Sequence, residues 1–342
     1  MPQVTVIIPA YNAEAYIKRC VRGILAQTHR ELRLLVVDDG STDRTGAILD
    51  ALAAEDPRLQ PLHAENGGPA AARNRALDLL GPETDYILFS DADDEMPPDA
   101  IEYALREGAG ADLVLTGFSI VQPDGSQSDY SEPYERLDPD TMGAALGRLY
   151  KANLLNQVWA KLFRASLILD AGLRFADYRW GEDRLFVYDC LERARSVAVL
   201  PECKYRYLMH PGESLITKYY DKKLEVCLLS DRRMQALCRR FGVEDEADFR
   251  YMFMKSVFSC LTTLYAPSCT LRPAEKRAEI RRIVSDEQVR ARSRDVFGGP
   301  SVKLLCAVVR SASVPLNALC FRAVARAGAL APRLFTKLKH RK

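Results

Sequence analysis

The feature that most constrains the fold of this chain is a regular alternation of apolar, β-branched runs with helical patterns along its first 121 residues. The runs typical of strands are 4–9, 32–39, 85–94 and 111–121. The segments with a helical spacing of apolar residues are 13–27, 41–55, 69–80 and 99–108. Almost continuously apolar strands that alternate with helices predict a mostly parallel sheet with helices on both faces. The expected fold class is therefore α/β.

Polar residues collect where these strands end. The clusters are Pro9–Asn12, Asp38–Ser41, Asn66–Gly68 and Ser90–Asp94. In open sheets of this kind, ligands bind beyond the carboxyl ends of the strands. Four polar clusters at these ends therefore predict one ligand site.

After about residue 122 the pattern loosens, and from about residue 221 the chain reads as mostly helical. We divide the chain into a domain of residues 1–218, whose halves meet near residue 122, and a helical C-terminal region of residues 219–342. The composition, 48% hydrophobic and 27% charged, allows a sizeable core. Nine cysteines without a Cys-x-x-Cys pair favour reduced thiols. With neither a signal-peptide pattern nor a long apolar run, we expect a cytoplasmic protein.

The strand at 85–94 ends on three aspartates, Asp91, Asp93 and Asp94. Carboxylates this close raise each other's pKa unless a cation relieves them. In an extended strand end, Asp91 and Asp93 would point to the same side, and such oxygen donors suit Mg²⁺ or Mn²⁺. The alternative is a solvated strand end that also caps the next helix.

Two other strand ends carry groups suited to a nucleotide. The Asp39 carboxylate accepts hydrogen bonds and does not donate them, so it suits a base with an N–H edge, such as uracil or guanine. The turn before the helix that begins near Pro69 offers N–H groups at Gly68 for a phosphate or a sugar hydroxyl, with Arg73 one turn further on. The alternatives are plain turns and helix starts, with Ser41 as the cap of the helix after Asp39.

Adjacent acids, Glu182 and Asp183, begin another helical pattern. Transfer of a sugar to a hydroxyl with inversion needs one carboxylate to take the proton. One of the two acids is therefore a candidate general base, and the other a structural or acceptor-binding group. The alternative is a helix N-terminus that favours acids through its dipole.

Taken together, these stretches resemble glycosyltransferase family 2, a large family of inverting enzymes with the Rossmann-like GT-A fold. The matching pieces, in that family's order, are "VTVIIPAYNAEAYIKRCVRGILAQTH", "LLVVDDGSTDRT", "NGGPAAARN", "YILFSDADD", "VWAKLFR" and "GEDRLFVYDCL". They lie within about residues 3 to 215. The resemblance implies a nucleotide-sugar half at 1–122 and an acceptor half at 123–218. It also implies a nucleotide-diphosphate sugar donor, usually UDP-linked, and displacement dependent on Mn²⁺ or Mg²⁺.

The family's pattern also implies roles for single residues. It places Pro9, Tyr11 and Glu14 around the nucleobase and ribose, and Asp39 on the uracil. It places Arg73 near the nucleotide, and Asp91 and Asp93 at the ribose and the metal. Asp183 is the general base in this pattern.

The resemblance also covers the acceptor side. Trp159, Lys161 and Glu182 fall in the family's acceptor-side segment, although Trp159 has core packing as an equal alternative. In the segment after the base, many relatives carry an arginine where this chain has His210. His210 is a candidate metal ligand or phosphate donor, with an ordinary loop histidine as the alternative.

The C-terminal 42 residues, 301–342, contain nine Lys or Arg and no Asp or Glu. A basic amphipathic helix binds anionic membrane surfaces, which suggests a peripheral protein on the cytoplasmic face of the membrane. The alternative is a packed helix with a frayed basic tail. Because the basic residues gather here without an aromatic-rich binding pattern, we expect no nucleic-acid partner.

The expected function is metal-dependent, inverting transfer of a sugar from a UDP-sugar to a hydroxyl of a saccharide or lipid-linked saccharide. Its expected context is the biosynthesis of a bacterial capsule, exopolysaccharide or lipopolysaccharide. Two alternatives stay open. One is a synthase of polyprenyl-phosphate sugars, and the other is a non-catalytic subunit that binds nucleotide sugars.

Overall fold

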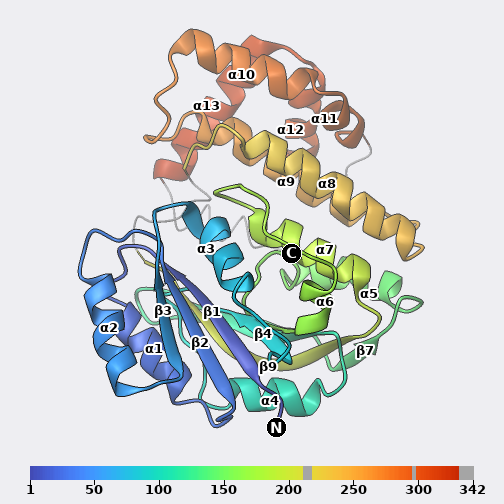
Figure 1. The fold of residues 1–342 in the computed structure, drawn as a ribbon. Coiled ribbons are helices and arrows are strands. Elements are labelled where there is room, and N and C mark those ends of the chain that lie inside the picture. The colour runs from blue at the N-terminus through green and yellow to red at the C-terminus, as the bar shows by residue number, and fades with distance from the viewer. Residues whose placement is uncertain (211–217, 295–297, 331–342) are drawn as a thin grey trace. The chain divides into compact units, whose positions relative to one another are not determined.

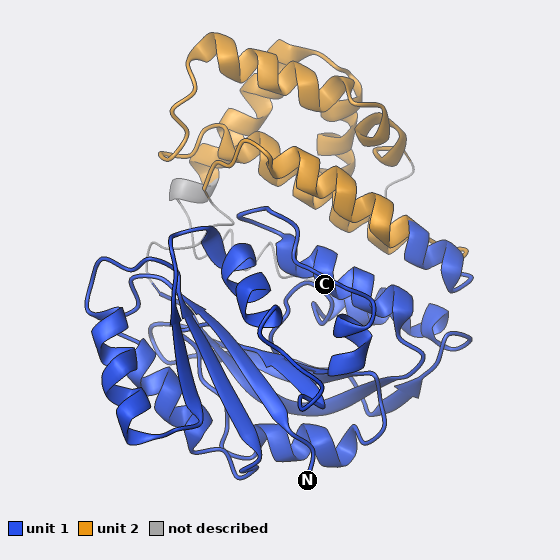
Figure 2. Ribbon diagram, viewed as in Figure 1, with its two compact units in different colours: residues 1–211, 236–243 blue, residues 212–235, 244–342 orange. Residues whose placement is uncertain are grey.

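The structure of the chain is a computed structural model that describes residues 1–210, 218–294 and 298–330. Its packing divides the chain into two compact units, residues 1–211 with 236–243 and residues 212–235 with 244–342 (Figure 2). Helix α8 (Lys223–Arg240) therefore contributes its last turn to the first unit. The functional boundary expected near residue 218, and the division near residue 122, stay predictions.

The first unit is built on one mixed sheet of nine strands in the described residues. The strands are β1 (Val4–Ala10), β2 (Leu32–Asp38), β3 (Leu59–His63), β4 (Tyr86–Phe89), β5 (Leu113–Val121), β6 (Gln127–Tyr130), β7 (Glu135–Leu137), β8 (Lys161–Arg164) and β9 (Val197–Leu208). Their order is β3-β2-β1-β4-β8-β5-β9-β7, with β6 beside β5 (Figure 1).

The first strands of the sheet pair in parallel, as the sequence predicted, and the described residues have four parallel and four antiparallel strand pairs in all. β1 pairs in parallel with β2 and β4, and β2 with β3, so their carboxyl ends lie at one edge. In the β1–β2 pair, Ala10 lies opposite Asp38. β8 is the exception near the centre, because it runs antiparallel to both β4 and β5. It brings the chain back beside β4, the strand that precedes the aspartates.

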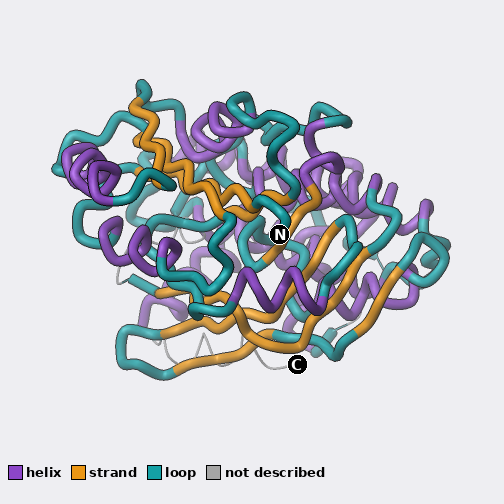
Figure 3. The backbone as a smooth tube through the Cα atoms, turned by 60° about the horizontal axis from the view of Figure 1, so that its bottom comes forward, coloured by secondary structure: helices purple, strands orange, loops and turns teal. Residues whose placement is uncertain are grey.

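Helices cover both faces of the sheet (Figures 1 and 3). On one face, α1 (Ile17–Leu25), α2 (Thr45–Glu55) and α4 (Ala100–Glu107) bury their apolar sides against alternate residues of the strands, such as Val6 and Ile8 of β1. On the other, α3 (Gly68–Leu77) lies against β1 and β2. Its fully buried Ala72 and Ala76 are small enough to allow close approach to the sheet.

An aromatic cluster joins α7 (Glu182–Arg193) to the same unit. The Phe89 ring, at the end of β4, meets Phe163, Phe175 and Phe186 edge to face at centroid distances of 5.7, 5.3 and 5.7 Å. Phe175 and Phe186 stack at 4.0 Å. Because the ring edges are electropositive and the faces electronegative, these arrangements are favourable as well as apolar. They fix the start of α7 close to the end of β4.

Two local expectations are wrong. β4 ends at Phe89, so Asp91 and Asp93 lie in a turn and the two-residue side-chain period does not apply to them. Ser41 does not cap α2, which begins at Thr45; its hydroxyl instead accepts a hydrogen bond from the Asn12 N–H at 2.9 Å. The polar segment 122–140 contains the short strands β6 and β7.

The C-terminal part is helical, as expected. Its helices, besides α8, are α9 (Ala247–Thr263), α10 (Pro273–Ser285), α11 (Glu287–Arg292), α12 (Pro300–Arg310) and α13 (Val314–Leu330). A buried ion pair joins Arg292 to Asp231 of α8 at 2.9 Å. Searching the described residues finds no helix that is both long enough and apolar enough to span a membrane. Residues 331–342 of the basic tail lie outside the described residues.

Two short helices of the first unit, α5 (Met142–Lys151) and α6 (Ala165–Leu169), lie before and after β8 in the sequence.

Candidate active site

Residues of β9 hold the loop that carries Asp91, Asp93 and Asp94 in place. The Tyr205 hydroxyl, fully buried, donates to Asp94 Oδ2 at 2.7 Å and accepts from the Asp91 N–H at 3.0 Å. The Leu208 N–H donates to the other Asp94 oxygen at 2.9 Å. Burial raises the pKa of Asp94, and the nearby charges of Asp91 and Asp93 raise it further. Asp94 is therefore an internal anchor, which leaves Asp91 and Asp93 as the acids available to a ligand.

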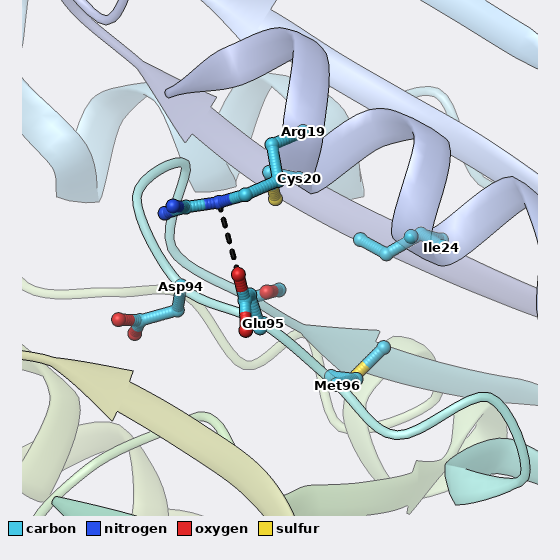
Figure 4. A pocket seen from close by; sticks show the side chains of 8 residues that line it. Arg19, Cys20, Ile24, Asp94, Glu95 and Met96 are labelled. Carbon is cyan, nitrogen blue, oxygen red and sulfur yellow. Dashed lines mark ion pairs between the residues drawn. The ribbon is translucent and has the colours of Figure 1, made fainter. Parts of the chain in front are cut away.

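Helix α1 holds the same loop from another side, across a pocket of about 200 Å³ (Figure 4). Arg19 pairs with Glu95 at 3.1 Å, the dashed line in Figure 4, and also donates to the Asp93 carbonyl at 3.1 Å. The Cys20 thiol lies 3.4 Å from the Asp91 carbonyl. The backbone around Asp91 and Asp93 is thus fixed independently of their side chains.

Arg73 brings the acids of two distant segments together. Its guanidinium, 3% exposed, donates to Asp91 Oδ1 at 2.9 Å, to Asp183 Oδ1 at 2.8 Å and to Glu182 Oε1 at 3.2 Å. The first acid follows β4, and the other two begin α7. The donor-side acid and the expected general base therefore share one cation. We call these four residues the Arg73 cluster.

The electrostatics of the Arg73 cluster are dominated by burial. Burial would lower the pKa of Arg73, but the charges of Asp183, Asp91 and Glu182 outweigh it and raise the pKa. Burial raises the pKa of Glu182 to about 7 and that of Asp91 to about 6, in spite of the neighbouring guanidinium. Three acids facing one arginine leave an excess of negative charge. A cationic ligand or a second positive side chain would relieve it.

Asp39 and the glycine turn are joined to each other. The Gly67 and Gly68 N–H groups donate to the two Asp39 oxygens at 2.9 and 2.7 Å, and Arg75 donates to the same carboxylate at 3.2 Å. Gly68 has φ +85°, a conformation that favours glycine. These first N–H groups of α3 are therefore filled by an internal carboxylate. The binding of a phosphate or sugar hydroxyl at this helix start, and the contact of Asp39 with a base, stay predictions.

The residues expected around the base lie at the end of β1. Pro9 is part of that strand, and the Tyr11 side chain that follows it is 54% exposed, which leaves its ring free for stacking. Glu14 accepts hydrogen bonds from the Arg44 backbone and side chain at 3.1 and 3.2 Å. The structure thus gives Glu14 a role in fixing the start of α2. A direct contact of Glu14 with a nucleotide stays a prediction.

All three acceptor-side residues are buried in the structure. Trp159, 8% exposed, stacks on Tyr205 and Tyr207 at centroid distances of 4.6 and 5.7 Å, so the structure supports its packing alternative. Lys161 is 2% exposed, and its ammonium reaches only the Trp159 carbonyl, at 3.4 Å, among the hydrogen bonds of the described residues. A direct contact of Lys161 with an acceptor stays a prediction. The third residue, Glu182, is held by Arg73.

Two of the candidate metal ligands, Asp93 and His210, lie next to each other. His210 Nε2 is buried without a hydrogen-bond partner among the described residues, and it lies 3.6 Å from Asp93 Oδ2. The His210 ring also packs on Tyr16 at 4.4 Å. Within the described ranges, no group of three or more acids, histidines and cysteines surrounds a metal position. Because Mg²⁺ and Mn²⁺ sites often use one or two protein ligands plus substrate phosphates, two ligands are sufficient.

Sequence reasoning missed Tyr205, which positions the whole aspartate loop. The signal was present in the alternation of Tyr205 and Tyr207 along β9, because residues two apart share one face of a strand. Both rings stack on Trp159. The burial of Lys161 gave no such signal, since it depends on the unexpected strand β8.

Comparison with solved structures gives the fold. The first solved structure to note is TarS 1–349 of S. aureus in complex with UDP-GlcNAc, with a TM-score of 0.68, 22% identity, and coverage of 95% of this chain and 92% of that one. This likeness establishes the fold, a GT-A-like sheet with a helical C-terminal region. It confirms the predicted fold class.

The sequence comparisons give the family. The model of "Glycosyl transferase family 2" matches residues 5–165. An uncharacterized glycosyltransferase of Haemophilus influenzae is 31% identical over 57% of this chain and 74% of its own length. Uncharacterized glycosyltransferase EpsJ of Bacillus subtilis is 27% identical over 85% of this chain and 86% of its own length. Chondroitin synthase of Pasteurella multocida is 39% identical over 37% of this chain and 13% of its own length. The chain belongs to glycosyltransferase family 2 and is a glycosyltransferase, as its motifs predicted.

Proposed function

We propose that this enzyme transfers a sugar, with inversion, from a UDP-sugar to a hydroxyl of a saccharide or lipid-linked saccharide. The observation that carries the proposal is the Arg73 cluster, in which one buried guanidinium holds Asp91 and Asp183 at 2.9 and 2.8 Å. A donor-side acid and a general base must both lie at the donor site, and these two are bound to a common cation. Asp91 and Asp183 lie far apart in the sequence, so their common contact with Arg73 is set by the fold and not by local chain geometry.

In this proposal Asp183 is the general base. Arg73 binds Asp183 Oδ1, so the carboxylate is held in one orientation while 18% of the side chain stays exposed. As the acceptor oxygen attacks the anomeric carbon opposite the diphosphate, Asp183 takes its proton. Bond formation on the face opposite the leaving group inverts the anomeric configuration.

The donor side is proposed to lie at the ends of β1, β2 and β4. The exposed Tyr11 ring is placed to stack on the base, with Pro9, Glu14, Asp39, Gly68 and Asp91 lining the donor site around it. A divalent cation held by Asp93 and His210 would supply Lewis-acid stabilisation of the departing UDP. TarS, of the same fold, is seen with UDP-GlcNAc, which supports a UDP-linked donor.

For the acceptor, we propose a growing cell-surface polysaccharide or its lipid-linked precursor. The 39% identity to chondroitin synthase, an enzyme named for a polysaccharide product, supports this class. A membrane-borne acceptor also agrees with the surface of α12 and α13. There Leu304, Leu316 and Leu319 are 63%, 43% and 71% exposed, beside exposed Lys303, Arg310, Arg322 and Arg326. Basic side chains next to exposed leucines suit an anionic lipid surface.

The test is a transfer assay with Asp183→Asn. A panel of UDP-sugars and oligosaccharide acceptors is screened for UDP release, and the variant is then compared with the wild type. We expect turnover to fall about 10²–10⁴-fold with little change in donor affinity, because general-base catalysis has that magnitude. Asp189→Asn, on the same helix, is the matched control and should keep its activity.

Two outcomes would contradict the proposal. Transfer by Asp183→Asn at the wild-type rate would remove this residue from the mechanism. Transfer to a polyprenyl phosphate and to none of the hydroxyl acceptors would assign the enzyme to the synthases of lipid-phosphate sugars.

A further inference from the structure

Two cysteines of the C-terminal part meet at the contact of α8 and α9. The sulfur of Cys227 in α8 lies 3.8 Å from the sulfur of Cys260 in α9, and either thiol can donate in this contact. Cys227 is 2% exposed and Cys260 is 5% exposed, and both belong to the second compact unit. Because a disulfide bond is about 2.05 Å long, the two sulfurs are about 1.8 Å from bonding distance. A side-chain rotation is enough to close that gap.

A buried lysine accompanies this pair of thiols. Lys223, the first residue of α8, is 2% exposed, and its ammonium donates to the Ser259 hydroxyl at 2.9 Å. Lys223 and Cys227 are four positions apart and therefore share one face of α8. Ser259 directly precedes Cys260 in α9. The lysine thus brings a positive charge close to both thiols, and a nearby cation favours the thiolate, the nucleophilic form of cysteine.

Burial keeps the pair slow to react in the folded protein. The hydrogen bond with Cys227, and then burial, raise the pKa of Cys260, and the charge of Lys223 opposes that shift. Buried thiols of this kind are inert until they are exposed. Cys227 lies only one turn after the start of α8, and helix ends open locally more readily than helix centres. Opening of that turn would admit a small oxidant to both sulfurs.

We propose that Cys227 and Cys260 form a reversible disulfide bond when the protein meets hydrogen peroxide, with Lys223 as the cation that favours the attacking thiolate. One thiol attacks the peroxide, its sulfur is oxidised to a sulfenic acid, and one water leaves. The second thiol then attacks that sulfur, so that the S–S bond forms and the sulfenic oxygen leaves as a second water. Two thiols are oxidised and one peroxide is reduced to two waters. The bond would link α8 to α9, independently of the proposed transfer reaction.

The direct test maps the disulfide bonds of the oxidised full-length protein. Reduced protein is incubated with hydrogen peroxide, its remaining thiols are alkylated, and its peptides are identified by mass spectrometry before and after reduction with dithiothreitol. We expect the peptides of Cys227 and Cys260 to be linked and to separate on reduction. Cys227→Ala should abolish this link, whereas Cys306→Ala, which removes another buried thiol of the same unit, should keep it. Free thiols at both positions, or equally frequent links to other cysteines, would overturn the inference.

The rate of the same reaction tests the role of Lys223. We expect Lys223→Met to form the bond about three- to tenfold more slowly, because a one-unit rise in a thiol pKa lowers the thiolate fraction tenfold while the thiolate gains some nucleophilicity. Lys223→Arg, which keeps the charge, should recover part of the rate. Lys222→Met, at the exposed neighbouring position, is the control and should react as the wild type does. Equal rates in the wild type and Lys223→Met would contradict the role of this lysine.

Thermal unfolding shows whether the fold accommodates the bond. The bond joins positions 33 residues apart, and a closed loop of that kind restricts the unfolded chain. We expect the oxidised protein to have a higher apparent Tm than the reduced protein, and dithiothreitol to reverse the shift. Cys227→Ala should show no such reversible rise. A linked protein that unfolds at the same or a lower temperature would contradict a disulfide site built into the fold.

Discussion

At the scale of single residues, Arg73 decides whether the site exists. It lies inside α3, almost fully buried, and three carboxylates from two segments bind its guanidinium. Its plane also lies 5.3 Å from the Phe175 ring centroid. Removal of one partner from a buried charge cluster leaves the others without compensation, which costs far more than loss of an exposed pair.

Replacing Arg73 with methionine should therefore destabilise the protein strongly. We expect the free energy of unfolding in urea to fall by about 3–5 kcal/mol, because the acids of the cluster stay buried without their cation. Arg174→Met is the matched control. Its partner Asp78 and Arg174 itself are 62% and 39% exposed, and exposed pairs contribute about 0–1 kcal/mol. Similar losses in both variants would contradict the importance given to Arg73.

The roles of residues could be predicted from the sequence only in part. The types and order of the motifs indicated the family, the acids and the candidate base. The hydrogen-bond partners of those acids could not be predicted, because Arg73 and Asp183 are 110 positions apart. Local residue spacing carries no information about such distant contacts. Lys161 illustrates the same limit: the family resemblance placed it on the acceptor side, whereas its burial depends on a strand that the sequence did not reveal.

At the scale of elements, one histidine of β3 joins that strand to β2 and α2. His63, the last residue of β3, lies 3.0 Å from Asp38 at the end of β2 and 3.0 Å from Asp50 of α2. Hydrogen bonds to Asp38 and then Asp50 raise the pKa of His63. Burial opposes the change at Asp38, but hydrogen bonds from Ser41 and His63 lower its pKa. The bridge is thus strongest when His63 is protonated and Asp38 ionised.

This bridge predicts a pH-dependent contribution to stability. A raised histidine pKa stabilises the fold fully below the unfolded value of about 6.5, and the effect is lost as the pH rises through the folded value. The lowered pKa of Asp38 stabilises above about 4 and is lost as the pH falls. We expect His63→Gln to lose more unfolding free energy at about pH 5.5 than at about pH 8.5. An equal loss at both values would count against the bridge.

The elements themselves were largely predictable. β1, β2, β4 and β5 and the helices between them follow the apolar periodicity, because each must bury one face or both. Strands such as β6, β7 and β8 are short and polar or follow irregular segments, so periodicity alone does not reveal them. The antiparallel insertion of β8 between β4 and β5 is set by tertiary pairing, which a single sequence does not encode locally.

At the scale of the whole molecule, a prediction concerns lipid. Because α12 and α13 expose leucines beside basic side chains, we expect the intact protein to sediment with vesicles that contain phosphatidylglycerol, and less so in high salt. Leu319→Glu should weaken this binding, while Leu79→Glu, a control at an exposed leucine of the first unit, should not. Equal binding to vesicles of phosphatidylcholine alone would contradict an electrostatic surface.

The central claim, that the chain is a metal-assisted enzyme for a UDP-linked donor, is tested most directly by calorimetric titration. The purified protein is titrated with UDP, GDP and ADP, with and without Mn²⁺, and the series is repeated with Asp93→Asn. We predict binding of UDP that requires Mn²⁺ and is lost in the variant, because Asp93 is a proposed ligand of the ion that meets the diphosphate. Preference for GDP would contradict the donor assignment. Equal UDP binding by Asp93→Asn, or by the wild type without metal, would contradict the proposed metal site.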